Sequence, residues 1–214
     1  MADVKICGLT DPQSVRATLD GGARFIGFMF FAKSPRNVTL DQAAALAGPA
    51  RGRAEIVAVT VDASDDALAA IQTVLKPDYI QGHGAETPAR VAAMRRFAPK
   101  GVIKAFGIAT AEDLAATAQF QEADYLLLDA KAPAGAERPG GNGAAFDWTI
   151  LQGRRLPRPW MLSGGLTPQN AAEAIALSGA ALVDVSSGVE ARPGVKDPER
   201  IAAFLAAAGA RPAR

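Results

Sequence analysis

The chain alternates between short apolar runs and longer segments with helical spacing, and this alternation limits its possible folds more than any other feature. Most of the runs are apolar throughout, a pattern typical of strands that are buried on both faces of a sheet. We predict eight strands, over residues 4–7, 25–30, 55–61, 78–81, 102–106, 125–128, 160–162 and 182–185.

The segments between these runs carry signals for helix starts. Capping-box spacing, in which Gln or Asp follows three residues after a threonine, occurs at Thr10, Thr39 and Thr110. A capping residue directly before proline, which favours the first turn of a helix, occurs at Thr87, Thr167 and Asp197. We therefore predict roughly eight helices, one after each strand.

Strands that alternate with helices predict a parallel sheet with helical crossovers. Such a sheet is either open and doubly wound or closed into a (β/α)8 barrel. No G-x-G-x-x-G follows the first strand, so the dinucleotide-binding fold lacks its best marker. Eight units within 214 residues fit a compact barrel. We predict a single (β/α)8 TIM barrel of the phosphate-binding type over residues 1–214.

Composition and charge exclude several classes of protein. Hydrophobic residues make up 49% of the chain and the formal net charge is +1, which excludes a disordered chain and gives no reason to expect nucleic-acid binding. Cys7 and His83 are the only residues of their kinds, so the chain has no internal disulfide, no cysteine-based zinc cluster and no histidine-pair metal motif. We expect no metal at the site.

The sequence also carries expectations about location. A lone cysteine suits a reducing compartment. The first residues lack the apolar stretch of a signal peptide, and the longest nearly apolar run, 25–32, is too short to span a bilayer. We expect a soluble, cytoplasmic protein without a membrane partner.

Two strands end in residues that can transfer protons. Cys7 ends the first predicted strand, where it is either a small buried hydrophobic residue or, if its pKa is lowered, a base or nucleophile. Asp129 follows three leucines at the end of the sixth, where it is either a cap or a general acid with a pKa raised by desolvation. In a barrel both ends face the active site, so Cys7 and Asp129 are predicted to flank one substrate.

Three glycine-rich segments follow the last three strands. Each is an ordinary turn if considered alone, but together they predict a phosphate site, because glycine lets backbone N–H groups approach an anion. The residues we expect to take part are Gly141, Gly143, Gly164, Gly165, Ser187 and Gly188. The first two lie in a long connection, 130–145, whose length is typical of a functional lid.

Arg36 and His83 follow the second and fourth strands. Arg36 is either a solvated surface charge or a bidentate partner for a substrate carboxylate. His83, as the only histidine, is a possible base or substrate-binding residue, although a loop hydrogen bond explains it better.

These segments, in this order, resemble the phosphoribosylanthranilate isomerase family of tryptophan biosynthesis. The matching pieces include VKICGLT at 4–10, SPR at 34–36, LLLDAK at 126–131, GGNGAAFDW at 140–148, LSGGLTPQN at 162–170 and VDVSSGVEARPGVKD at 183–197. The resemblance covers nearly the whole chain.

The resemblance implies an aldose–ketose isomerase, which converts N-(5-phosphoribosyl)anthranilate to 1-(2-carboxyphenylamino)-1-deoxyribulose 5-phosphate by an Amadori rearrangement. The family's general base maps to Cys7, its general acid to Asp129, and its carboxylate-binding arginine to Arg36. No cofactor is implied, because the substrate's own iminium accepts electrons. The chain departs from the family at Gly82, where leucine is usual, and at Asn142, where threonine is common. Gly82 is expected to loosen the end of the fourth strand.

Two alternatives remain at this point. A related isomerase of histidine biosynthesis performs the same rearrangement, but it resembles two duplicated half-barrels with aspartate at both proton-transfer positions. A non-catalytic phosphate-binding barrel would be expected to have lost Cys7 or Asp129. The partner in every case is a small phosphorylated molecule, and the chain is expected to be a monomer or a homodimer.

Overall fold

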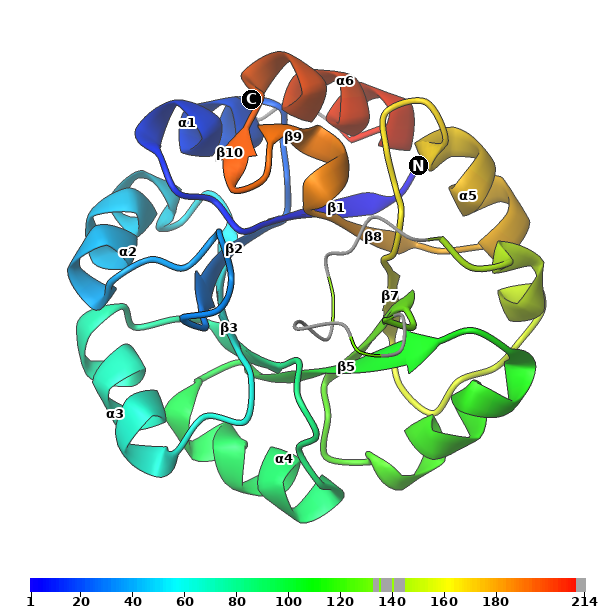
Figure 1. Ribbon diagram of the computed structural model, residues 1–214, viewed down its shortest axis with the longest axis horizontal. Helices are drawn as coiled ribbons and strands as arrows, with labels where there is room; N and C mark the ends of the chain where they lie inside the picture. The colour runs from blue at the N-terminus through cyan, green and yellow to red at the C-terminus, as the bar shows by residue number, and fades with distance from the viewer. Residues whose placement is uncertain (133–134, 136–139, 141–144, 211–214) are drawn as a thin grey trace.

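Eight parallel strands close into a barrel in chain order in the computed structural model, which describes residues 1–132, 135, 140 and 145–210 (Figure 1). The (β/α)8 fold is therefore confirmed, and every predicted strand is present within two residues of its expected bounds. The strands are β1 (Asp3–Cys7), β2 (Phe25–Phe30), β3 (Glu55–Thr60), β4 (Tyr79–Gly82), β5 (Gly101–Ile108), β6 (Tyr125–Ala130), β7 (Trp160–Leu162) and β8 (Leu182–Val185).

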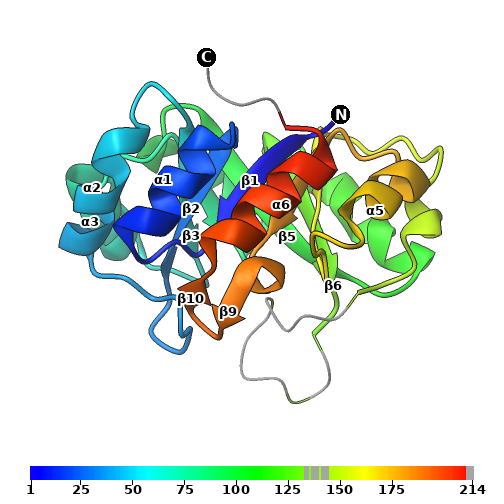
Figure 2. The same ribbon diagram turned by 90° about the horizontal axis from the view of Figure 1, so that it is seen from above.

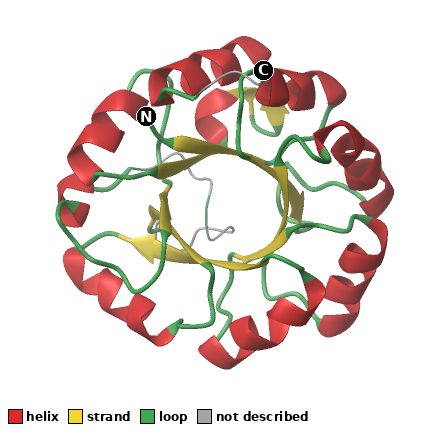
Figure 3. Cartoon of the chain, turned by 180° about the vertical axis from the view of Figure 1, so that it is seen from behind, coloured by secondary structure: helices red, strands yellow, loops and turns green. Residues whose placement is uncertain are grey.

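Helices surround this ring of strands (Figures 1 and 3). The α-helices are α1 (Pro12–Asp20), α2 (Leu40–Ala47), α3 (Asp65–Val74), α4 (Pro88–Met94), α5 (Ala171–Ser178) and α6 (Pro198–Ala208). The 3-10 helices are η1 (Gly48–Ala50), η2 (Arg95–Phe97), η3 (Ala111–Gln119), η4 (Trp148–Leu151) and η5 (Ser187–Val189). The crossovers after β5 and β6 hold the 3-10 helices η3 and η4 rather than the predicted α-helices.

The helix starts follow the predicted caps at α2, α4 and α6, where the side chains of Thr39, Thr87 and Asp197 accept hydrogen bonds from backbone N–H groups of the first turn. The prediction for α1 is wrong by one residue. Asp11, not Thr10, is its N-cap and accepts from the backbone N–H of Ser14, while the Thr10 hydroxyl donates to the carbonyl of Gly194.

The start predicted for α5 is also wrong. The N–H of Thr167 donates to the side chain of Asn170 at 2.7 Å, which forms a turn before the helix. The helix itself begins at Ala171. At η3 the carboxylate half of the predicted capping box is present, since the Asp113 side chain accepts a hydrogen bond from the N–H of Thr110 at 3.0 Å.

The core has two parts, one between the strands and helices and one inside the barrel. Inward-facing side chains alternate along each strand, and those of alternate strands form layers across the barrel. The layer nearest the strands' amino ends, from the even-numbered strands, is Phe25, Tyr79, Tyr125 and Leu182. The next layer, from the odd-numbered strands, is Lys5, Val57, Ile103 and Met161.

A short antiparallel hairpin, which the sequence analysis did not predict, follows β8. It consists of β9 (Glu190–Arg192) and β10 (Val195–Lys196). In Figure 2 it lies at the lower end of the barrel, opposite the N-terminus. The hairpin turn packs against the loop after β2, where Gly194 lies against the carbonyl of Pro35.

Within the described residues, no helix combines the length and apolar character that a membrane crossing requires. The same part of the chain contains no group of three or more His, Cys, Asp or Glu residues that could hold a metal ion.

Candidate active site

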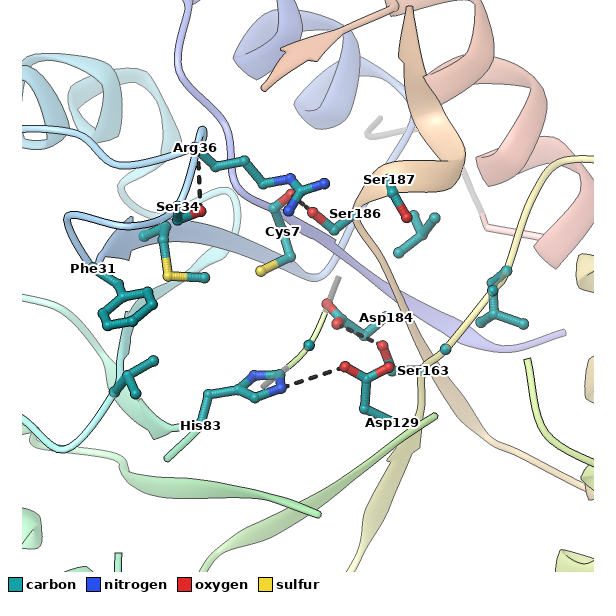
Figure 4. A pocket seen from close by; sticks show the side chains of 17 residues that line it. Cys7, Phe31, Ser34, Arg36, His83, Asp129, Ser163, Asp184, Ser186 and Ser187 are labelled. Atoms are coloured by element: carbon teal, nitrogen blue, oxygen red, sulfur yellow. Dashed lines mark hydrogen bonds and ion pairs between the residues drawn. The ribbon is translucent and has the colours of Figure 1, made fainter. Parts of the chain in front are cut away.

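A cavity opens at the carboxyl ends of the strands (Figure 4). This is the end at which TIM barrels place their active sites. Of the predicted site residues, the structure brings Cys7, Arg36, His83 and Asp129 together with Gly164, Gly165 and Ser187 in the wall of this cavity.

Cys7 is the last residue of β1, and its thiol points into the cavity from one side while the Asp129 carboxylate points in from another (Figure 4). Gly27 on the neighbouring strand leaves room for the thiol, because a Cβ there would lie 3.2 Å from the Cys7 Sγ. Burial raises the pKa of the Cys7 thiol, and the nearby charges of Lys5 and Lys196 offset only part of this effect. From the sequence, Cys7 is predicted to act as a base only if its pKa is lowered, and burial acts in the opposite direction.

A buried ion pair lies beneath the thiol. The Lys5 Nζ, fully buried, donates to the Asp184 Oδ1 at 2.7 Å, and the Ser163 hydroxyl donates to the other carboxylate oxygen at 3.2 Å. Lys5 precedes Cys7 by two residues, so both face the barrel interior. The positive charge of Lys5 therefore lies next to Cys7 and is neutralised by the Asp184 carboxylate.

Asp129 is the fifth residue of β6 and is 6% exposed. The N–H of Ala130 donates to its Oδ1 at 2.9 Å, and the Nε2 of His83 lies 3.4 Å from its Oδ2. The Nδ1 of His83 is in turn 2.8 Å from the Nε2 of Gln81. His83 is thus an ion-pair neighbour of the candidate acid, held in place by a residue of β4.

The loop that carries His83 is held by a second buried pair, Lys104 and Glu86, at 2.8 Å. Glu86 also accepts from the N–H of Gly84. Gly82 remains in register within β4, and a Cβ there would lie 2.9 Å from the carboxyl carbon of Glu86. The expectation that Gly82 loosens the strand is wrong, because the Glu86 carboxylate occupies the space beside it.

Arg36 is buried rather than solvated, with an exposed fraction of 4%. Its Nε donates to the Glu190 Oε1 at 2.6 Å and its Nη2 to the Oε2 at 3.0 Å. Its stem crosses Gly8, where the backbone has φ +76° and a Cβ would lie 2.5 Å from the Arg36 Cδ. Only glycine at position 8 permits both the turn and this crossing.

The glycine turn after β7 supports an anion site. Gly164 and Gly165 both adopt left-handed backbone conformations, with φ of +87° and +65°. The N–H groups of Gly165 and Leu166, which line the cavity, donate no hydrogen bond to any described residue. They are available to an anion.

The other glycines predicted for this site differ in position. Gly188 lies directly against the carbonyl of Leu166, so its missing side chain permits close packing of the two turns. Gly141 and Gly143, together with Asn142, lie outside the described residues. Gly140 lies against the His83–Asp129 pair.

Sequence reasoning missed several residues of the site. Met29, Phe31 and Val61 are apolar residues in the wall of the cavity. Lys5 and Asp184 had a usable signal, since each is a charge inside an otherwise apolar strand, where only a paired ion is tolerated. Glu190 and Lys196 lie in the family-matching segment 183–197, but their positions gave no sign of burial, because charges in a polar segment are usually solvated.

Comparisons with known proteins agree with this geometry. The sequence profile of the family described as N-(5'phosphoribosyl)anthranilate (PRA) isomerase matches residues 4–207. The N-(5'-phosphoribosyl)anthranilate isomerase of Rhodopseudomonas palustris is 54% identical over 97% of this chain and 96% of that protein. The one from Caulobacter vibrioides is 52% identical over 94% and 93%.

Solved structures give the same result. The phosphoribosyl anthranilate isomerase of Thermotoga maritima superposes with a TM-score of 0.88 at 32% identity, covering 98% of this chain and 99% of that one. A phosphoribosyl anthranilate isomerase in complex with reduced 1-(o-carboxyphenylamino)-1-deoxyribulose 5-phosphate superposes with a TM-score of 0.85 at 30% identity and the same coverage. The chain belongs to the N-(5'-phosphoribosyl)anthranilate isomerase family.

Proposed function

We propose that this protein catalyses the isomerisation of N-(5'-phosphoribosyl)anthranilate to 1-(o-carboxyphenylamino)-1-deoxyribulose 5-phosphate, with Cys7 as general base and Asp129 as general acid. The observation that carries the proposal is the placement of a thiol and a carboxylate on different sides of one cavity, at the catalytic end of the barrel. Membership of the family supplies the substrate.

The acid step opens the sugar. Asp129 donates a proton to the furanose ring oxygen, the bond between that oxygen and C1 breaks, and the anilino nitrogen forms an iminium with C1. His83 keeps the Asp129 carboxyl oriented through the contact at its Oδ2. A positioned general acid contributes typically about 10²–10⁴-fold.

The base step moves the second proton. The Cys7 thiolate removes the proton from C2, and the electron pair flows into the iminium to give an enolamine, which tautomerises to the ketone. The buried Lys5 ammonium below the thiol favours the thiolate, while the Asp184 carboxylate paired with it and burial both oppose it. The iminium accepts the electron pair, so this chain's own acid and base suffice.

Binding groups at opposite ends of the substrate orient it. Arg36 receives the anthranilate carboxylate, with the apolar side chains of Met29 and Phe31 beside the ring. The N–H groups of Gly165 and Leu166 receive the phosphate, with Ser187 and the turn at Gly188 beside them. Fixing both ends orients C1 and C2 for proton transfer.

The direct test is turnover of freshly prepared substrate, followed by the loss of its fluorescence. We expect turnover by the unmodified protein and a loss of at least about a hundredfold in kcat for Cys7→Ala and for Asp129→Ala. Circular dichroism of each variant checks that it remains folded.

Each other outcome points elsewhere. Turnover that survives in Cys7→Ala would keep the reaction but refute the base. A folded protein without turnover that still binds the phosphorylated product analogue would instead be a phosphate-binding barrel without this activity.

A further inference from the structure

We propose that Glu190 is a positioning residue for substrate specificity, which holds the Arg36 guanidinium so that one edge of it faces the cavity. This inference rests on the proposed function, in which Arg36 receives the anthranilate carboxylate. It assigns a task to the β9–β10 hairpin, which takes no part in the barrel's own sheet.

The fork of the guanidinium is divided between two tasks. Glu190 takes the edge formed by Nε and Nη2, with distances of 2.6 and 3.0 Å to its two carboxylate oxygens. The Nη1 group donates to no described residue, and Arg36 lines the cavity. A bidentate pair fixes the plane of the guanidinium, so the remaining edge has a defined direction.

Lys196 on β10 ties this pair to the strand end that carries the thiol. Its Nζ donates to the Glu190 Oε1 at 2.9 Å and to the carbonyl oxygen of Ser186 at 2.8 Å. The Ser186 hydroxyl then donates to the carbonyl of Cys7 at 3.0 Å. The carboxylate-binding arginine and the candidate base are therefore connected by consecutive hydrogen bonds.

The hairpin backbone is itself anchored on both sides. Arg200 of α6 donates to the carbonyl of Glu190, and the Thr10 hydroxyl donates to the carbonyl of Gly194 at 3.2 Å. Glu190 is 6% exposed and Lys196 is 4% exposed. These contacts leave the Glu190 carboxylate little freedom to follow a moving guanidinium.

The charges of this cluster allow a sharp test. Arg36, Glu190 and Lys196 carry a formal charge of +1 together. Glu190→Gln raises this total to +2 where Lys196 keeps its proton and leaves it at +1 where Lys196, whose pKa Glu190 raises, loses it. The total does not fall in either case, so if charge alone decides affinity, the variant binds a carboxylate at least as tightly. If Glu190 acts by positioning, the variant binds it more weakly, because the guanidinium loses its fixed orientation. Only positioning thus predicts weaker binding.

The experiment compares two probes by isothermal titration calorimetry at pH 7, where Lys196, with a pKa of about 8, is charged. One probe is reduced 1-(o-carboxyphenylamino)-1-deoxyribulose 5-phosphate, and the other is the same compound without the ring carboxyl. For the unmodified protein we expect tighter binding of the carboxylated probe. For Glu190→Gln we expect this preference to fall by about tenfold, with the affinity for the second probe unchanged.

The matched control is Glu86→Gln. Glu86 is a second buried glutamate paired to a buried lysine at the same end of the barrel, and its ion-pair partner is Lys104 rather than Arg36. We expect Glu86→Gln to lower stability in a similar way and to keep the preference for the carboxylated probe. The ratio between the probes separates positioning from general destabilisation.

An unchanged or larger preference in Glu190→Gln would overturn the proposal. If Glu190→Gln does not fold, Glu190→Asp decides, because it keeps the charge but shortens the reach by one methylene. An unchanged preference in folded Glu190→Asp would equally refute it. If the unmodified protein itself shows no preference between the probes, the failure lies in the proposed function rather than in the role of Glu190.

Discussion

The two ends of the barrel interior differ sharply in chemistry. At the amino ends of the strands, the rings of Phe25, Tyr79 and Tyr125 pack edge to face, with centroids 5.8–5.9 Å apart. Ions at that end, such as Arg24 and Asp3, are about half exposed. At the carboxyl ends, ion pairs such as Lys5–Asp184 are nearly or fully buried around a cavity.

This difference shows at which end of the barrel the fold buries charges despite the cost of removing them from water. Buried charges lose hydration, and well-packed apolar residues of similar size often serve stability as well or better. The aromatic end follows that rule and closes the barrel. The polar end departs from it at the cavity where the proposed proton transfers take place, so its buried ions are best explained by function.

Truncating the aromatic end gives the largest expected loss of stability. Phe25→Ala removes a fully buried ring from a packed layer and is expected to lower the free energy of unfolding by about 4 kcal/mol. Urea denaturation measures this loss. The kcat of the folded fraction should stay within about twofold, and a tenfold fall would show that the two ends are coupled.

The next largest effect is expected from breaking the ion pair under the thiol. Lys5→Met leaves the Asp184 carboxylate buried without its partner, and we expect a loss of about 3 kcal/mol. The same change removes a positive charge that lowers the pKa of Cys7, so thiol alkylation at a fixed pH should slow. The double variant with Asp184→Asn should recover part of the stability. No recovery would contradict the pairing.

The protonation of Cys7 gives a smaller, graded effect. Burial raises the thiol pKa above its ordinary value of 9.0, and the reactive form is the thiolate. The rate of alkylation by iodoacetamide should therefore rise roughly tenfold per pH unit across the neutral range and level off only above pH 9. A plateau already at pH 7 would mean that the surrounding charges outweigh burial.

The smallest effect is expected at the exposed ions of the aromatic end. The Arg24–Asp3 pair has side chains 46% and 51% exposed, so Arg24→Ala should cost no more than about 1 kcal/mol in urea denaturation. High salt should reduce even this difference. A loss as large as that of Lys5→Met would remove the distinction between the two ends.

Much of the barrel could be predicted from sequence because its strands are buried on both faces. Runs such as 25–30 and 125–128 are apolar throughout, and burial alone decides their structure. The β9–β10 hairpin escaped prediction because its sequence, EARPGVK, has no apolar run. The cap at Thr10 failed because the neighbouring Asp11 accepts the hydrogen bond from the first turn, and the cap at Thr167 failed because a turn closed by Asn170 precedes the helix.

The residues of the candidate site also fall into two groups, those that the sequence predicted and those that it did not. Cys7 and Asp129 could be found because strand ends in a barrel converge on one face. Glu190 could not, since it is 154 residues from its partner Arg36 and only the folded chain brings the two together. A contact of that kind leaves no trace in local spacing.

The pairing of β1 with β8, the first and last strands of the barrel, determines when the candidate site is complete. Lys5 and Asp184, like Cys7 and Ser186, are 179 residues apart, and their contacts form only when the first strand meets the last. While β8 is still being synthesised, the nascent chain contains Cys7 but lacks the Lys5–Asp184 ion pair and the strand that pairs with β1 on that side. In the proposed mechanism turnover requires these contacts, so an activity assay also measures how much of a refolding sample has completed the barrel.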